Sequence, residues 1–587
     1  MGAMHLARRG VRAMFSNTPV AADLLTQLVG SAFKGLDASA LRESIEDAVG
    51  AVALTHDLGH PPFSHALEDS FHVLSERWAT EDTPAPWGAF TEFKGAYHEF
   101  AGLDLLHQLT RDLGPEEDDD EQLYSPFLRL VLCIAQSDPD AAEWPSALHS
   151  IVAGQLDIDR LDYVMRDAQR AGTEFGTLDY VRLVDAFELH LVEKNHVEPQ
   201  QSRFTIGLGA HARSAAESLL IQRAQSYEWI IFHHRVVASN KALTEAIDML
   251  LEFTRADDRV ALPEAPSLTV KEVFQFETEC LNYIRPDLSR HGLTISAPTP
   301  LPDSARRLRQ ASVDDGLVLR LLHDGLLAGE TLIAEAVMDE AIRRRLERFA
   351  ACARAVLVRE KRLIPVWKTG EDWRRIALDV VGDGALGREL RSRVSELVER
   401  YEGTPGGRYI RNVGGVTVKL LARSDTCVVG ANRVLGLLMP HARYRSALAI
   451  QLAGDGTVLR QRRLIGSWLI AHQPFEAIKN KGRPLVLYYR QVPEPLANGS
   501  PLVQALEQSE DLRVSTLAFY VVHDQFAAQE LVERNLLRNA LRQTVRDVLP
   551  EFVRETWPKH LENIAERLNR DTSGASRGGL GSPGTGT

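Results

Sequence analysis

Apolar residues recur at helical spacing through most of the first 400 positions, which predicts a mainly α-helical protein. The run Ile45–Leu54 is apolar almost throughout and indicates a largely buried helix. Residues 158–167 carry an apolar stripe at a spacing of three and four, with charged positions between. Residues 340–349 alternate in the same way and predict an amphipathic helix. These patterns place the core of the fold in packed helices.

The pattern changes between Gly403 and about Asn498, where glycines and β-branched residues become more frequent. The runs Gly415–Leu421 and Pro484–Tyr489 are typical of strands. A further strand is expected at Ala518–Val522, before a second His-Asp pair that we interpret as a strand end. The sequence therefore predicts a small α/β module that closes with a helix over residues 529–549.

Four regions follow from these patterns. The first is a helical core that carries every candidate motif. It is followed by a second helical region, then by the α/β module, and last by a Gly/Ser/Thr-rich tail that is expected to be disordered. Their expected bounds are 1–260, 261–400, 401–570 and 571–587.

Composition agrees with an intracellular globular protein. Of 587 residues, 44% are hydrophobic and 25% charged, and the formal net charge is −13. That charge argues against broad electrostatic capture of nucleic acid, which requires a basic surface. The four cysteines are scattered without the spacing of a metal site or a disulfide framework. We find neither a signal peptide nor a transmembrane segment in the pattern, and expect a cytoplasmic protein without a membrane partner.

The segment Thr55–His65 is the most informative chemistry in the chain. His56 and Asp57 are adjacent and offer a divalent metal one imidazole nitrogen and one carboxylate oxygen. His60 and His65 follow on a stretch that a glycine and two prolines keep out of helical geometry. The pair therefore lies where the buried helix ends and a loop begins.

A second group of polar residues lies on the helix predicted around residues 158–167. Asp159, Tyr163 and Asp167 recur every fourth position, so they share one helical face. Such a face is suited to be a pocket wall. Taken alone, it is better interpreted as the solvated side of an ordinary amphipathic helix, and the histidine string upstream favours the pocket wall.

A third element lies between these two. His98 and Glu99 open an apolar-periodic stretch that extends to Leu106. A carboxylate bonded to one ring nitrogen of a histidine fixes the tautomer of the other, which suits proton transfer. The competing interpretation is a histidine at a helix start that faces water.

Together, these strings resemble the signature of the HD superfamily of metal-dependent phosphohydrolases. The run HDLGHPPFSH at 56–65, followed by Glu68, and the run DIDRLDYVMRD at 157–167 are most similar to the deoxynucleoside triphosphate triphosphohydrolase branch. The resemblance implies a helical HD-domain core. It also implies one divalent metal ion (Mn, Mg, Fe or similar) held by His56, Asp57 and Asp159, with additional Mg²⁺ accompanying the nucleotide.

The resemblance also implies roles for the remaining polar residues. His65 and His98 would exchange protons with the attacking water and the leaving oxygen, and Glu99 would orient an imidazole. Supporting polar groups in the pocket would be His60 and Glu68.

On the second motif, the resemblance places Tyr163 against the deoxyribose and Asp167 near the sugar hydroxyl or phosphates. Arg160 and Arg166 are candidates for phosphate contacts, because guanidinium binds phosphate oxygens in a bidentate fork.

The sequence departs from the family at its first metal ligand, a histidine that opens an H-S-L-G-V motif. Met4–Ala7 matches the residues that directly follow this motif, so the ligand histidine is expected to fall before residue 1. The alternative is that His5 substitutes for it, although its register differs by more than a helical turn.

The expected reaction is hydrolysis of a deoxynucleoside triphosphate to the deoxynucleoside and inorganic triphosphate, in a homo-oligomeric enzyme. Two alternatives stay open from the sequence. One is HD-type hydrolysis of another nucleotide or phosphoester, and the other is a catalytically inactive nucleotide sensor, which the absent first histidine would favour.

Overall fold

The fold is that of a computed structural model of the chain, which describes helices and strands in both halves of the sequence. The described residues are 2–37, 39–66, 68, 97–112, 125–137, 143–154, 156–192, 203–253, 259–261, 268–269, 315–381, 385–421, 430, 434, 466–473, 486–489, 492–513, 515–522 and 531–575.

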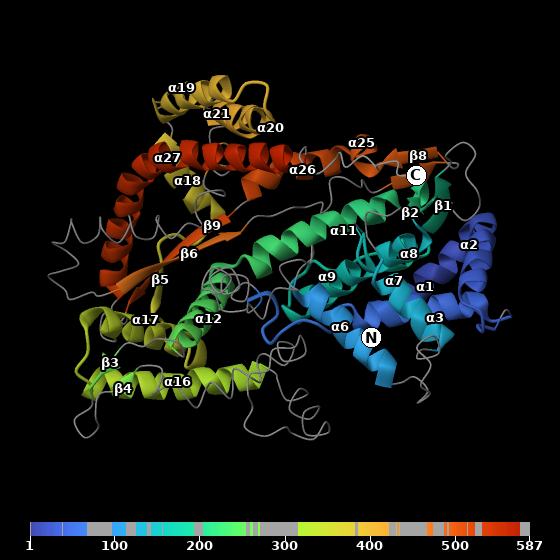
Figure 1. Cartoon of the computed structure of the whole chain (residues 1–587), viewed down its shortest axis with the longest axis horizontal. Coiled ribbons are helices and arrows are strands. Elements are labelled where there is room, and N and C mark those ends of the chain that lie inside the picture. Colours follow the sequence, from blue (N-terminus) through green and yellow to red (C-terminus); the bar gives the residue numbers. More distant parts are fainter. Residues whose placement is uncertain are drawn as a thin grey trace, which may run out of the picture. The chain divides into compact units, whose positions relative to one another are not determined.

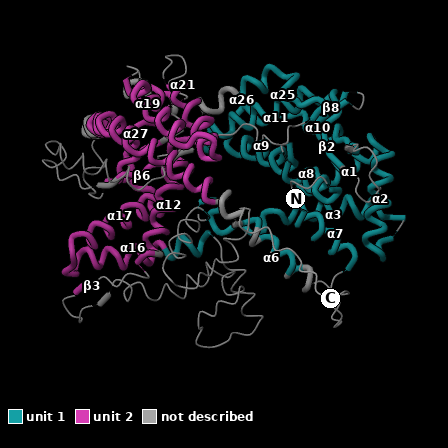
Figure 2. The backbone as a smooth tube through the Cα atoms, turned by 45° about the horizontal axis from the view of Figure 1, so that its top comes forward, with its two compact units in different colours: residues 1–231, 271–321, 476–508 teal, residues 232–270, 322–475, 509–587 magenta. Residues whose placement is uncertain are grey.

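The chain forms two compact units, each assembled from three separate stretches of sequence (Figure 2). Unit 1 comprises residues 1–231, 271–321 and 476–508. Unit 2 comprises residues 232–270, 322–475 and 509–587. Neither unit is therefore a continuous segment of the chain.

Helices make up most of unit 1. Helix α1 (Gly2–Asn17) packs against α3 (Leu41–Thr55), and α3 in turn packs against α7 (Pro126–Ala135) and α8 (Trp144–Val152) (Figure 1). The other helices of the unit are α2 (Pro19–Ala32), α6 (Tyr97–Asp112), α9 (Ile158–Arg170), α10 (Tyr180–Val184), α11 (Arg213–Ser226), α25 (Leu496–Gly499) and most of α26 (Pro501–Arg513). A 3-10 turn η2 (Ala210–Ala212) precedes α11, and a π-helix η3 (Tyr227–Ile231) follows it.

The starts of α9, which carries Asp159, and of α7, which packs against α3, have local causes. Asp157 caps α9 by accepting a hydrogen bond from Arg160 N at 2.7 Å. Ser125 caps α7 in the same way, and Pro126 occupies the first helical position, where its missing N–H is not required. Both helices bury an apolar face, because Leu130, Ile134 and the α9 stripe are almost fully enclosed.

A four-stranded sheet in unit 1 has the order β1-β2-β7-β8. Strands β1 (Phe187–Val192) and β2 (Arg203–Gly209) form an antiparallel pair. β7 (Val486–Tyr489) joins β2 in parallel and pairs on its other side with β8 (Val492–Pro495). The sheet therefore joins segments that are almost 300 positions apart in the sequence.

Unit 2 is also mainly helical. Its helices are α12 (His234–Phe253), α17 (Glu340–Leu357), α18 (Gly370–Val381), α19 (Ala385–Arg400), α20 (Pro405–Tyr409), the π-helix η4 (Ile410–Gly415), α21 (Val416–Leu421) and α27 (Leu531–Ala575). Helix α16 (Asp315–Glu335) begins in unit 1 and continues into the residues of unit 2. A three-stranded antiparallel sheet, ordered β5-β9-β6, consists of Leu363–Pro365, Ser515–Val522 and Gly466–Gln473, and β3 (Arg259–Val260) pairs with β4 (Leu268–Thr269).

The prediction of a mainly helical protein is confirmed, with the strands confined to small sheets. The helices expected at 45–54, 158–167 and 340–349 are present as α3, α9 and α17. β9 ends at Val522, directly before His523, as expected for that second His-Asp pair.

One predicted strand is wrong. Gly415–Leu421 is helical, comprising the end of η4 and all of α21. Thr417, Val418 and Leu421 are its buried residues, which is helical spacing. The closing helix expected at 529–549 is longer than predicted, since α27 continues to Ala575. The expected tail therefore begins inside this helix, and its residues 576–587 lie outside the described residues.

The segments expected as an α/β module contribute to both units, since β7 and β8 belong to unit 1 and β6 and β9 to unit 2. Within the described residues, no helix combines the length and apolar character needed to cross a membrane.

Candidate active site

His56 and Asp57 lie where α3 ends, and Asp159 lies in the first turn of α9. His56 Nε2 is 3.3 Å from Asp57 Oδ1 and 3.4 Å from Asp159 Oδ1. One ligand atom from each of the three residues falls within 4.8 Å of the others. The structure thus brings the sequence-predicted metal ligands together from segments about a hundred residues apart.

The His56 ring is oriented by its other nitrogen. Nδ1 donates a hydrogen bond to the carbonyl of Ala53 at 3.0 Å, which leaves Nε2 facing the two carboxylates. Nε2 is buried, and no described residue meets hydrogen-bond geometry with it. Burial works against the charged ring, but Asp159 and Asp57 outweigh it and raise the pKa of His56 to about 9. A buried nitrogen beside two carboxylates fits a divalent cation, which would replace the proton that this pKa describes.

A second cluster is centred on the Glu68 carboxylate, which is 4% exposed. His65 Nδ1 donates to Glu68 at 2.9 Å and His98 Nδ1 donates at 3.0 Å. The backbone N–H of His98 donates to the same carboxylate at 3.1 Å. Burial opposes ionisation of Glu68, yet these hydrogen bonds hold its pKa well below the usual range. One carboxylate therefore orients two imidazoles through the Nδ1 atom of each ring.

Glu68 takes the role that the sequence suggested for Glu99. Glu99 is exposed on α6, and the acceptor for His98 Nδ1 is Glu68, 30 residues earlier in the chain. The different directions of Glu99 and His98 have a simple physical cause. Adjacent helical residues point in directions about 100° apart, so Glu99 cannot share the direction of His98.

His60 connects the two clusters. Its Nε2 is 3.4 Å from Asp57 Oδ1, and its Nδ1 forms a hydrogen bond with Ser64 Oγ at 3.1 Å. The His60 ring stacks on His98, with centroids 4.0 Å apart and an interplanar angle of 15°. The candidate metal ligands and the paired histidines thus form one continuous site.

A glycine contact sets the position of α6 against this loop. A Cβ on Gly59 would lie 2.0 Å from His98 O and 2.2 Å from Gly102 N. Only a residue without a side chain permits such an approach. Gly59 therefore allows the helix that carries His98 to lie directly on the loop that carries His56 and Asp57.

The structure places the four predicted substrate residues of α9 in different environments. Asp167 and Arg166 are exposed, and Arg166 forms an ion pair with Asp162. The Arg160 guanidinium is almost enclosed and donates to Gly154 O at 2.5 Å. Tyr163 is half-buried, and burial raises the pKa of its phenol. Both arginines therefore have partners within the fold.

Sequence reasoning missed Arg223 on α11. This arginine is 4% exposed and lies with its guanidinium 5.4 Å from the centre of the Tyr227 ring. Although burial opposes its charge, the phenols of Tyr163 and Tyr227 raise the pKa of Arg223. The π-helix that carries Tyr227 is a rare irregularity that often marks functional sites, but it leaves no simple sequence pattern.

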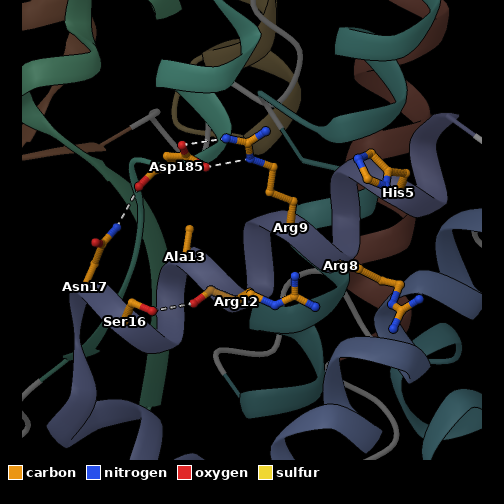
Figure 3. Close-up of a pocket in the computed structure, with 8 residues that line it drawn as sticks. All are labelled: His5, Arg8, Arg9, Arg12, Ala13, Ser16, Asn17 and Asp185. Atoms are coloured by element: carbon orange, nitrogen blue, oxygen red, sulfur yellow. Dashed lines mark hydrogen bonds and ion pairs between the residues drawn. The ribbon is translucent and has the colours of Figure 1, made fainter.

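A separate cavity of about 670 Å³ lies along α1 (Figure 3). Three arginines line it, and each has a carboxylate partner: Arg8 with Asp47, Arg9 with Asp185 and Arg12 with Glu46. His5 also lines this cavity. Among the described residues, it is not part of the group that His56, Asp57 and Asp159 form, which does not support its substitution as a ligand.

No protein-family model matches the chain. An uncharacterised protein of Bacillus subtilis is 24% identical over 249 residues, which are 42% of this chain and 47% of that protein. A deoxyguanosinetriphosphate triphosphohydrolase-like protein of Rhizobium meliloti is 34% identical over 134 residues, which are 22% of this chain and 33% of that protein. A deoxynucleoside triphosphate triphosphohydrolase of Xenopus laevis is 29% identical over 161 residues, 23% of each chain. The matches span less than half the length of these curated relatives.

Among solved structures, a phosphohydrolase from Bacteroides thetaiotaomicron aligns with 89% of this chain and 86% of its own. The TM-score is 0.41 and the sequence identity is 16%.

Proposed function

Because this chain is an HD-domain phosphohydrolase distantly related to the deoxynucleoside triphosphate triphosphohydrolases, we propose that it converts a deoxynucleoside triphosphate to the deoxynucleoside and inorganic triphosphate. Two of its relatives carry names of that activity. The proposal includes a resident divalent cation at His56, Asp57 and Asp159.

The observation that carries the proposal is the buried Nε2 of His56. This atom makes no hydrogen bond to a described residue and lies 3.3 and 3.4 Å from two carboxylate oxygens. An imidazole nitrogen that faces two carboxylate oxygens at these distances offers the mixed nitrogen and oxygen ligand set that a divalent cation takes. When bound, a divalent cation supplies Lewis-acid polarisation of a phosphate oxygen.

The paired histidines supply the proton chemistry. Water attacks the α-phosphorus, the bond between phosphorus and the 5′ oxygen breaks, and the leaving oxygen takes up a proton. Since Glu68 accepts from Nδ1 of both His65 and His98, the Nε2 atom of each ring is the one that exchanges a proton. His60 positions the metal ligands relative to the paired histidines, because it contacts both Asp57 and the His98 ring.

The sugar and triphosphate are assigned to the exposed side of α9 and its neighbours. Tyr163 lies one helical turn beyond Asp159, about 6 Å along the helix axis. This spacing suits a deoxyribose next to an α-phosphate at the metal ligands. Asp167, one turn farther, would bind a sugar hydroxyl. Arg160, Arg166 and Arg223 each have partners within the fold, so a contact with phosphate would require each of them to exchange those partners.

The test is product analysis. The purified chain, supplied with Mn²⁺ or Mg²⁺, is incubated with dGTP, and the products are separated by ion-exchange chromatography. We expect deoxyguanosine and triphosphate in equal amounts. Formation of dGMP and pyrophosphate would contradict the proposed bond cleavage, and turnover of other phosphoesters alone would favour the broader HD-type activity.

Two variants test the assignment of proton carriers. His65→Ala and His98→Ala should each lower kcat by about 10²–10⁴-fold, the usual contribution of a general acid or base. Metal content should stay at the wild-type value. Loss of the ion from either variant would instead make that histidine a ligand.

A further inference from the structure

We propose that Asp315 is a positioning residue, which holds the backbone turn at Phe63 and Ser64 in a left-handed conformation and thereby sets the place of His65. The proposal rests on the proposed function, because it concerns the geometry of a proposed proton carrier. Asp315 belongs to none of the predicted motifs and to neither cluster of the candidate site.

The turn before His65 has an unusual backbone. Phe63 has φ of 58° and Ser64 has φ of 52°, and neither is glycine. Side chains disfavour this region, and a bulky aromatic residue is a clear outlier there. Such conformations persist only where surrounding contacts enforce them, and they cluster at functional sites.

Contacts within the segment hold Ser64. Its N–H donates to Pro61 O at 2.8 Å, and its hydroxyl forms a hydrogen bond with His60 Nδ1 at 3.1 Å. These contacts fix the second residue of the turn relative to the first half of the loop. They leave the Phe63 N–H to be satisfied from elsewhere.

Asp315 provides that acceptor. Its Oδ1 accepts a hydrogen bond from Phe63 N at 2.8 Å, across 252 positions of sequence. Asp315 is the first residue of α16, and both partners belong to unit 1. A charged acceptor makes a stronger hydrogen bond than a neutral one, and the helix start anchors the carboxylate. The bond therefore holds the strained residue that stands two positions before His65.

The consequence concerns the His65 ring. His65 Nδ1 reaches Glu68 at 2.9 Å only while the turn directs the side chain towards the buried carboxylate. If Phe63 relaxes to negative φ, the chain direction at His65 changes and the ring moves away from its partner. The candidate metal ligands His56, Asp57 and Asp159 lie outside this turn, so we expect the metal content to change less than the rate.

The experiment compares Asp315→Ala, Asp315→Asn and a matched control, Asp339→Ala. Asp339 is likewise an exposed aspartate at a helix start and accepts from Ala341 N at 2.7 Å, but it lies in unit 2. The readouts are kcat, KM, metal content, melting temperature and hydrogen–deuterium exchange of a peptide that covers residues 61–66.

Asp315→Ala should lower kcat at least about 10-fold, the scale of loss that follows a small misplacement of a reacting group. KM and metal content should stay within about twofold of wild type, and the 61–66 peptide should exchange faster. Asp315→Asn retains a carbonyl acceptor and should recover most of the activity. Asp339→Ala should match wild type in every readout except a small decrease in melting temperature.

Wild-type kcat and exchange in Asp315→Ala would overturn the inference, as would a loss of metal or of global stability that accounts for the lost rate. Equal impairment by Asn and Ala would also overturn the hydrogen-bond account. A wild-type protein that hydrolyses no nucleotide would contradict the proposed function instead. In that case the exchange comparison still decides whether Asp315 holds the turn.

Discussion

At the scale of single residues, the proton chemistry of the site depends on the buried carboxylate of Glu68. It accepts hydrogen bonds from two imidazoles and one backbone N–H. From the sequence, Glu68 was expected to be a supporting polar group and Glu99 the acid that orients the imidazole. Nothing in the sequence shows which carboxylate accepts the hydrogen bond from His98 Nδ1. The histidines and glutamates of the site were thus predictable from the sequence, whereas the hydrogen bonds between them could be assigned only from the folded structure.

The lowered pKa of Glu68 predicts a pH dependence of stability. Burial opposes ionisation, but the histidine hydrogen bonds hold the pKa well below the ordinary 4.5. The native state therefore binds this proton less readily than the unfolded state. The ionised Glu68 carboxylate therefore stabilises the folded protein fully above pH 4.5. This stabilisation is lost as the pH falls through the lower pKa that Glu68 has in the native state.

Glu68→Gln should remove the part of the pH dependence of stability that comes from Glu68. We expect the melting temperature of the variant to decrease less steeply than that of wild type as the pH is lowered from 4.5, the ordinary value of the group. Thermal unfolding followed by circular dichroism over a series of buffers measures both slopes. Parallel slopes would show that Glu68 does not titrate differently in the folded protein.

Tyr163 provides a second prediction at this scale. A ring packed against C2′ of the sugar leaves no space for a hydroxyl there, so deoxynucleotides should be preferred. Tyr163→Ala should erode the ratio of dGTP to GTP turnover at least about tenfold, as expected when a steric contact worth roughly 1–3 kcal/mol is removed. Tyr163→Phe keeps the ring and should retain the preference. Equal use of both nucleotides by the wild type would contradict this role.

At the scale of elements, helices with a strong apolar period were predictable, and so were strands β7 and β9, whereas one predicted strand is helical. Helices α3 and α9 follow directly from their buried stripes. Val416–Leu421 is rich in β-branched residues, yet it forms α21, because burial of Thr417, Val418 and Leu421 outweighs local propensity. The parallel pairing of β7 with β2 is non-local, and no feature of either strand specifies the other.

The contact between Gly59 and α6 carries a prediction of its own. Gly59→Ala would place a methyl group 2.0 Å from His98 O, so α6 must shift and carry His98 with it. We expect a destabilisation of about 1–3 kcal/mol from overpacking, together with a kcat loss larger than the loss of metal. Urea unfolding and steady-state assays measure the two effects.

Gly415→Ala is the matched control for this variant, because a Cβ there meets no atom within 4 Å. It should leave both stability and turnover near wild type. If Gly59→Ala behaves like Gly415→Ala, the close approach does not position α6.

At the scale of the whole molecule, the two units are interleaved along the chain. The sequence suggested a catalytic core that ends near residue 260, but unit 1 also contains residues 271–321 and 476–508. β7 buries Leu487 against β2, where Leu208 is equally enclosed. Asp315, too, lies beyond the expected boundary. The homo-oligomer expected from the family resemblance stays a prediction, which light scattering of the purified chain would test.

Truncation tests this organisation. A chain that ends at residue 260 should expose the edge of β2 and the apolar surface that β7 covers, and it should therefore aggregate or melt well below the full chain. Size-exclusion chromatography and thermal unfolding of the two proteins provide the comparison. A monomeric fragment with the stability of the full chain would show that unit 1 does not require the later segments.

His56, Asp57 and Asp159 are together proposed to hold one catalytic divalent cation. The most direct measurement is the metal content per chain, by inductively coupled plasma mass spectrometry, of wild type, Asp57→Ala, Asp159→Ala and the control Asp167→Ala. Asp167 lies on the same helix as Asp159 but is exposed and outside the cluster of ligand atoms. We expect one ion per chain in wild type and Asp167→Ala, and neither ion nor activity in the other two, with helical content unchanged. A full complement of metal in Asp57→Ala or Asp159→Ala would contradict the account.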